Sequence, residues 1–237
     1  MKIGLVAEVK WEVREVCRRL KLRLIDQEEE TWGAQMNGHE LRLCLSGMVP
    51  SVAKKRVVRF LDSVKPDLMI CSGLAGALRP NVQVGEVIVQ SDNPRLVAET
   101  ELALKNKDIP FHVGSLVTVS QPVLTPVARR ELAAKGQAIA VDMESQTISA
   151  LCKERGIPCL AMKGVSDDID EDLSPILGGF EIINIPRIAM RVLVKPNTWP
   201  LAARLARHSY VAANNLGYGV WATLERLGNG SQSERPV

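Results

Sequence analysis

Aromatic side chains are scarce in this sequence. The 237 residues include only 3 Phe, 4 Trp and 2 Tyr, or 4% of the chain, although 46% of the residues are hydrophobic. The core is therefore expected to consist mainly of Val, Ile, Leu and Ala. A chain of this length can bury enough of these side chains to fold as one large domain without a metal ion or a disulfide.

Excess charge of one sign is also absent. Thirty Lys and Arg stand against 27 Asp and Glu, which leaves a net charge of +3. A nucleic-acid-binding domain usually carries a far stronger basic excess, so we expect no nucleic-acid partner. Charged residues make up 24% of the chain, an average value for globular domains that argues against a disordered or a membrane-embedded protein.

Long apolar runs and cysteine pairs are missing too. The N-terminal apolar run ends at Glu8, too early for a secretory signal, and the uncharged stretch 208–224 contains two Asn and two Gly, unlike a membrane span. The five cysteines are odd in number and form no Cys-x-x-Cys pair. Unpaired thiols fit a reducing compartment, so we expect a cytoplasmic protein.

No cofactor signature occurs. The three His residues are scattered, and the acidic run 167–172 lacks the glycine and the closing glutamate of an EF-hand. Neither a Walker A motif nor a dinucleotide fingerprint is present. We therefore expect no bound metal, although the acidic run could hold a divalent cation or could simply be a solvated loop.

The apolar periodicity predicts alternating strands and helices. Strands are expected at Lys2–Ala7, Thr31–Met36, Glu40–Leu45, Leu68–Cys71, Val84–Val89, Gly114–Val119, Ala138–Val141 and Cys159–Val165. Helices are expected from Val9 to Leu20, from Pro50, around Glu99–Asn106, from Pro126, over Met143–Arg155, and over Pro175–Val194 and Pro200–Leu227. Helical crossovers imply parallel strands, whereas Asn37-Gly38 favours an antiparallel hairpin. The pattern predicts one α/β domain with a mixed sheet over residues 1–227 and a disordered tail over 228–237.

Ligands of open α/β sheets bind beyond the carboxyl ends of the strands, where four groups of polar or small residues stand. These are Glu8 with Glu12, Ser72–Gly76, Asp142–Ser145 and Ser166–Asp168. The segment Ser72–Gly76 would let backbone amides approach a ligand, or would form a tight turn between strand and helix. Asp142 would cap a helix, whereas Glu144 has no such simple explanation and is a candidate site residue.

Four segments match one enzyme family in their order along the chain. They are Met1–Ala7 with Glu12-Val13; Ser46–Met48; Lys65–Asp67 through Ser72–Leu78 to Val84–Val87; and Ala140–Glu144 with Val165–Asp167. Together they resemble the purine and uridine phosphorylase superfamily, and within it the methylthioadenosine/S-adenosylhomocysteine nucleosidases. Gln121–Pro126, Val141–Ser145 and the stretch after Trp199-Pro200-Leu201 resemble the hopanoid-associated phosphorylase branch more closely. The resemblance implies a three-layer sandwich around a mixed central β-sheet.

The resemblance also implies a reaction, cleavage of the N-glycosidic bond of a purine nucleoside. The expected substrate is a 5′-substituted adenosine such as methylthioadenosine, S-adenosylhomocysteine or adenosylhopane, and the product is adenine. By position, Asp167 would protonate N7 of the base and Glu12 would activate water. Glu144 would bind the ribose hydroxyls and favour the cationic sugar. Met143 would lie against the ribose and Ser166 beside the base.

Departures from the family leave parts of this site open. Gly73, Leu74, Ala75 and Gly76 correspond to the segment that holds phosphate or the attacking water, but Leu74 replaces a hydroxyl residue. Val123 and Leu124 replace an aromatic that stacks on adenine, and Phe180 would either compensate for this loss or belong to the core. The chain is also shorter than the nucleosidases between Ser91 and Gly114, which suits a larger 5′ substituent.

Several alternatives remain at this point. The nucleophile is either water or inorganic phosphate as a co-substrate, and no other cofactor is expected. A nucleoside-binding protein with weak catalysis is the second hypothesis. The Arg-flanked C-terminal helix also suggests contact with a membrane surface. From the family, a homodimer or larger homo-oligomer is expected.

Overall fold

The computed structural model describes residues 1–27, 30–47, 50–179 and 185–233. Its strands are β1 (Lys2–Ala7), β2 (Arg23–Asp26), β3 (Thr31–Met36), β4 (His39–Leu45), β5 (Leu68–Ala77), β6 (Val87–Gln90), β7 (Phe111–Val113), β8 (Leu116–Thr118), β9 (Ala140–Asp142) and β10 (Cys159–Asp167). Its helices are α1 (Arg14–Arg19), α2 (Pro50–Val64), α3 (Pro94–Lys105), α4 (Pro126–Ala134), α5 (Ser145–Lys153), α6 (Ser174–Leu177), α7 (Ile185–Val194), the 3-10 helix η1 (Pro196–Thr198) and α8 (Trp199–Ser233).

The strands form one mixed sheet in the order β2-β3-β4-β1-β5-β10-β6-β7, with β9 added to β5 and β8 added to β9. Strands β4, β1, β5 and β10 run parallel, whereas β3 and β4 form an antiparallel hairpin. Its turn residues Asn37 and Gly38 have φ values of 48° and 77°, the left-handed backbone that an Asn-Gly turn supplies. The predicted hairpin and mixed sheet are confirmed.

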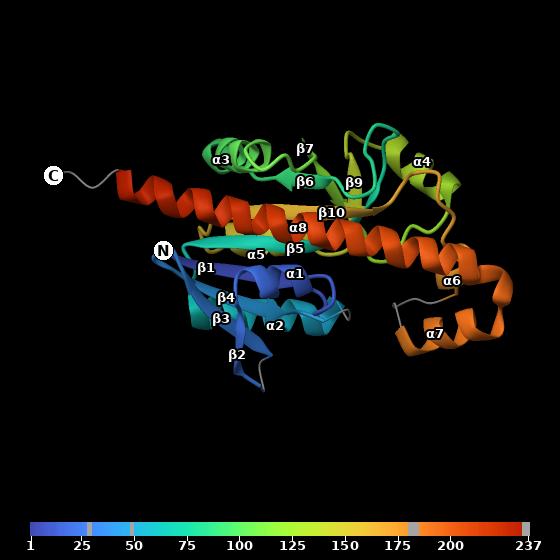
Figure 1. Ribbon diagram of the computed structural model, residues 1–237, viewed down its shortest axis with the longest axis horizontal. Helices are drawn as coiled ribbons and strands as arrows, with labels where there is room; N and C mark the ends of the chain where they lie inside the picture. Colours follow the sequence, from blue (N-terminus) through green and yellow to red (C-terminus); the bar gives the residue numbers. More distant parts are fainter. Residues whose placement is uncertain (28–29, 48–49, 180–184, 234–237) are drawn as a thin grey trace.

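Helices cover both faces of the sheet, so the molecule has three layers (Figure 1). On one face, side chains of α1, α3 and α8 pack on β1 and β10 in a core that includes Val16, Leu104 and Leu216. On the other face, α2 and α5 contribute Phe60 and Ile148 to a second core. Both cores are mainly aliphatic, as the composition predicts. The three-layer α/β sandwich is therefore confirmed.

Several element boundaries differ from the sequence prediction. Ser72–Gly76 is not a turn between strand and helix, because it continues strand β5 as far as Ala77. Strands β2 and β7 were not predicted. The single helix expected over Pro175–Val194 is divided into α6 and α7. The last helix was expected to end at Leu227, whereas α8 continues to Ser233.

No helix in the described part of the chain is long and apolar enough to cross a bilayer. The longest, α8, has 35 residues, but charged and polar side chains interrupt it throughout its first half. It runs along the sheet beside β10 and ends on the far side of the molecule from α7 (Figure 1).

Candidate active site

A cavity of about 260 Å³ lies beyond the carboxyl ends of β1, β5 and β10, with α6, α7 and α8 contributing to its wall. Among its lining residues are ten that the sequence proposed: Glu12, Leu74, Ala75, Gly76, Val123, Leu124, Met143, Glu144, Ser166 and Asp167. Gly73 lies next to the cavity, against the side chain of Glu144. Phe180 lies outside the described residues. The candidate residues thus come together from five separate stretches of chain.

Asp167 is the last residue of β10, and its side chain is buried between two partners. The Ser166 hydroxyl donates to Oδ1 at 2.5 Å, and the Arg129 guanidinium contacts Oδ2 at 2.5 Å. Burial raises the pKa of Asp167, while the charge of Arg129 and the Ser166 hydrogen bond act in the opposite direction. The net shift is upward, so this carboxyl keeps its proton to a higher pH than a solvated aspartate.

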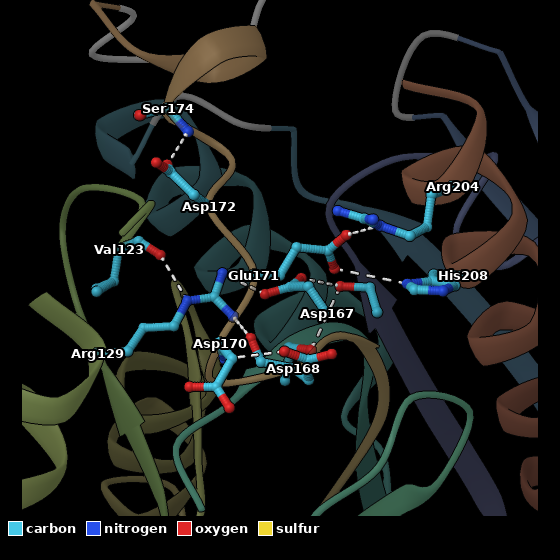
Figure 2. A network of polar contacts seen from close by, with 12 residues as sticks. Val123, Arg129, Asp167, Asp168, Asp170, Glu171, Asp172, Ser174, Arg204 and His208 are labelled. Carbon is cyan, nitrogen blue, oxygen red and sulfur yellow. Dashed lines mark hydrogen bonds and ion pairs between the residues drawn. The ribbon is translucent and has the colours of Figure 1, made fainter. Parts of the chain in front are cut away.

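Arg129 is itself almost fully buried, with 1% of its surface exposed. Helix α4 places it there. The Thr125 hydroxyl caps the first turn by accepting from the Ala128 N–H, and Pro126 opens the helix. The guanidinium donates to the backbone carbonyls of Val123, at 3.2 Å, and Asp168 (Figure 2). Arg129 therefore connects the segment that contains Val123, the loop after β10 and Asp167.

Gly76 permits the close approach of Asp167 to strand β5. A Cβ atom at this position would lie 2.6 Å from Asp167 Oδ2 and 3.5 Å from Arg129 Nη1. The first distance is shorter than any non-bonded contact of this kind. The small residues of β5 therefore make room for a charged pair, which is a different role from the turn expected from the sequence.

A second buried cation, Lys163, lies in the middle of β10. Its side chain is completely buried, with Nζ in an ion pair with Glu144 and 3.3 Å from Asp142 Oδ2. Burial alone would lower the pKa of Lys163, but the anionic groups around it raise it. Burial raises the pKa of Glu144 well above its usual range, against the effect of Lys163. A Cβ on Gly73 would lie 3.1 Å from Lys163 Nζ.

The acidic side chains around Lys163 outnumber this one cation. Glu12, only 8% exposed, lies close to Glu144, and Glu8 shares a hydrogen bond with Glu144. Burial raises the pKa of Glu12 to about 8, the nearby Glu144 adds to the shift, and Lys163 opposes it. Glu12 Oε2 has no hydrogen-bond partner in the described structure. Glu12 is thus a buried carboxyl able to exchange a proton near neutral pH.

Asp142 has the capping role that the sequence suggests as its simple explanation. Its carboxylate accepts the Ser145 N–H at 3.1 Å at the start of α5 and the Thr118 hydroxyl at 2.7 Å. These bonds hold the β9–α5 junction rigid. Glu144 follows two residues later, so the cap also fixes the backbone that carries Glu144 towards the cavity.

The loop after Asp167 is joined to helix α8 by another buried acid. Glu171, whose side chain is 2% exposed, accepts from Arg204 Nε at 2.7 Å and lies 3.5 Å from His208 Nδ1. Figure 2 shows this connection beside the Arg129–Asp167 pair. Since Leu205 and Ser209 of α8 line the cavity, the contact holds this cavity wall against the loop that follows Asp167.

Three residues that the sequence analysis did not select complete the site: Arg129, Lys163 and Trp11. Trp11 is about half exposed and lines the cavity, so an aromatic ring is available there after all. A lysine inside the otherwise apolar strand 159–165 is a signal that was available in the sequence. In the described parts of the chain, no group of three or more His, Cys, Asp or Glu could hold a metal ion.

The family model described as the phosphorylase superfamily matches residues 2–93 and 92–183. The chain therefore belongs to the phosphorylase superfamily.

Solved structures agree with this fold. The 5′-methylthioadenosine/S-adenosylhomocysteine nucleosidase from Neisseria meningitidis is 15% identical, with a TM-score of 0.75 and coverage of 94% of this chain and 98% of that one. The Colwellia psychrerythraea nucleosidase is 17% identical, with a TM-score of 0.74 and 96% coverage of each chain. Futalosine hydrolase of Helicobacter pylori is 16% identical, with a TM-score of 0.70 and coverage of 93% and 97%.

Proposed function

We propose that the protein hydrolyses the N-glycosidic bond of a 5′-substituted adenosine and releases adenine. The observation that carries this proposal is the presence of two buried groups in one cavity, Asp167 with Arg129 and Glu144 with Lys163. Gly73 and Gly76, which lie against these two groups, are three residues apart on β5, or about 10 Å along a strand. A base and its ribose can fill that space.

Asp167 is the proposed general acid. Adenine leaves poorly as an anion, so a proton or a strong hydrogen bond at N7 is needed as the bond breaks. The raised pKa of Asp167 lets this carboxylate take up a proton more readily than a solvated aspartate would, and Ser166 and Arg129 hold it in one orientation. The aliphatic side chains of Val123 and Leu124 line the cavity and would contact the base.

Glu144 is the proposed ribose ligand. Its carboxylate can accept hydrogen bonds from two sugar hydroxyls and can stabilise the positive charge that develops as the base departs. The ion pair with Lys163 fixes its position. Met143, also in the cavity wall, would give the sugar an adaptable apolar contact.

Water suits this cavity better than phosphate. Five acidic side chains line it, whereas Arg129 is its one lining cation in the described structure and is already bound to Asp167; the five are Glu8, Glu12, Asp142, Glu144 and Asp167. A phosphate dianion would therefore meet no unpaired cation among the lining residues of the described structure, whereas a neutral water molecule needs none. In its ionised form, which a pKa of about 8 makes a minor fraction at pH 7, Glu12 would take the proton of the attacking water.

The 5′ substituent would extend towards the helical wall. This wall is aliphatic, formed by Leu173, Leu177, Ile188 and Leu205. It suits methylthioadenosine, S-adenosylhomocysteine or a larger apolar group such as that of adenosylhopane, the substrate suggested by the hopanoid-associated branch.

The test is release of adenine from these nucleosides, measured with and without inorganic phosphate. We expect release without phosphate, and a loss of about 10²- to 10⁴-fold in Asp167→Asn because the acid is removed. Asp170→Asn is the matched control, since Asp170 lies exposed in the same loop. Strict dependence on phosphate would overturn the choice of water, and equal rates in the wild type and Asp167→Asn would overturn the enzyme mechanism.

A nucleoside-binding protein with weak catalysis is the second candidate, and Leu74 is the observation that favours it. Leu74 lines the cavity at the position of a hydroxyl residue in the resembling nucleosidases, so it offers the attacking water no hydrogen bond. Calorimetric binding of adenosine analogues without adenine release would support this second candidate.

A further inference from the structure

Helix α7 exposes large apolar side chains on the side away from the cavity. Met190, Leu193 and Val194 are 60%, 68% and 64% exposed, while Ile188 on the opposite side lines the cavity. The apolar side of the helix therefore extends from the cavity to the exposed surface, with arginines on the remaining side. An apolar side of this width is normally covered. Its main contacts are with α6, η1 and α8, at the end of the molecule where it projects (Figure 1).

The first three turns of α8 expose apolar side chains as well. Trp199, Ala203, Ala206 and Tyr210 are all exposed and lie on one side of the helix at its 3.6-residue period. The Trp199 indole N–H donates to the Val192 carbonyl at 2.9 Å, which leaves the ring facing outward with its polar atom satisfied. Aromatic rings placed in this way are typical of membrane–water interfaces.

The same segment carries charge of one sign only. Residues 185–210 include five Lys and Arg but no Asp or Glu. Lys195 and Arg207 are exposed, whereas Arg204 contacts Glu171 and Arg191 donates to the Ile176 carbonyl. Apolar side chains flanked by cations are the composition of helices that lie in the interface of an anionic bilayer.

A second copy of the chain fits this surface less well. Most homodimers are related by a twofold axis, so each surface would meet itself and the cations of one copy would face those of the other. A bilayer with anionic headgroups offers apolar contact and opposite charge together. No described helix spans a membrane, so the contact would be peripheral.

We propose that the exposed side of α7 and of the first three turns of α8 docks on the surface of an anionic lipid bilayer. The same two helices line the cavity through Ile188 and Leu205. If the proposed function holds, docking places on the bilayer the two helices whose inner sides form the aliphatic cavity wall, close to any lipid-held nucleoside with an apolar 5′ group. The docking itself does not depend on that function.

Co-sedimentation with vesicles tests the proposal on the full chain. We expect binding to an equal mixture of phosphatidylcholine and phosphatidylglycerol, weaker binding to phosphatidylcholine alone, and a decrease as salt is added. The double variant Leu193→Glu/Val194→Glu should reduce the bound fraction about tenfold or more. Leu102→Glu/Val113→Glu is the matched control, because these exposed residues on α3 and β7 are of the same types.

Two results would overturn the proposal. One is equal vesicle binding by the wild type and the α7 double variant. The other is a wild-type protein that binds no vesicles and forms a dimer in analytical ultracentrifugation, while the α7 double variant is a monomer. That result would assign the surface to a second copy of the chain. Circular dichroism verifies that the variants fold. Adenine release from water-soluble methylthioadenosine, measured without vesicles, separates failure of docking from failure of the proposed function.

Discussion

The two buried cations of the site, Lys163 and Arg129, lie in opposite electrostatic situations. Lys163 is surrounded by more acids than it can neutralise, because Asp142 and Glu144 contact it directly and Glu12 lies beside them. Arg129 contacts one carboxylate and otherwise binds neutral carbonyls. The excess of acids around Lys163 leaves one carboxyl able to keep a proton, whereas the matched, one-to-one pair of Arg129 and Asp167 fixes the orientation of the Asp167 carboxylate. The first group suits the exchange of a proton with water, and the second suits the holding of a base.

Removal of Arg129 should have the largest effect on folding. Arg129→Gln leaves the Asp167 carboxylate buried without its cation, and loss of one partner from a buried pair typically costs about 3–5 kcal/mol. Urea denaturation measures this change in the free energy of unfolding. The control is Arg130→Gln, since the adjacent arginine forms an exposed ion pair with Asp170 and should change stability by less than about 1 kcal/mol. Equal losses in both variants would contradict the matched-pair interpretation.

The excess of acids should appear as a pH dependence of stability. The native protein holds the Glu12 proton up to a pKa of about 8, whereas the unfolded chain releases it near the ordinary glutamate pKa of 4.5. The free energy of unfolding therefore falls as pH rises through this window.

In Glu12→Gln this contribution should disappear, so that the melting temperature falls less between about pH 5 and pH 8.5 than in the wild type. Thermal melts across that range measure it. Glu15→Gln serves as the control, because Arg18 lowers the pKa of Glu15 instead. If the melting temperature of Glu12→Gln depended on pH as steeply as that of the wild type, the group that keeps its proton would be another acid near Lys163.

Adding one methyl group at Gly76 should have a smaller effect on stability and a selective effect on activity. The new Cβ in Gly76→Ala would meet Asp167 Oδ2 at 2.6 Å, so the carboxyl must move, at a cost of about 1–3 kcal/mol. We expect kcat for adenine release to fall at least about tenfold. Gly136→Ala is the control, because its Cβ would meet no atom within 4 Å. Unchanged kcat in Gly76→Ala would show that the position of Asp167 is not critical.

Much of the fold could be predicted because it follows from local patterns. The apolar run of β1, the turn at Asn37-Gly38 and the helix opened by Pro126 all correspond to the structure. The segment Ser72–Gly76 was interpreted wrongly, because its small residues suggest a turn whereas they allow charged side chains to lie against a strand. Strand β7 has only three residues, too few for a periodic signal.

The site was partly predictable for a different reason. Residues at strand ends, such as Asp167 and Glu144, are marked by their position after an apolar run. Lys163 was also marked, as one charge inside such a run. Arg129 was not, because an arginine in a short amphipathic helix looks the same in sequence whether it faces water or a buried carboxylate. Only the tertiary contact distinguishes it from Arg130.

Helix α8 has a consequence for synthesis on the ribosome. Its residues Leu216, Val220 and Leu224 complete the core on one face of the sheet, and Leu205 and Ser209 complete the cavity. Until these 35 residues have been made, which takes a few seconds at about 5–20 residues per second, the rest of the domain exposes a bare aliphatic surface. The nascent chain is therefore most in need of a chaperone just before its cavity closes.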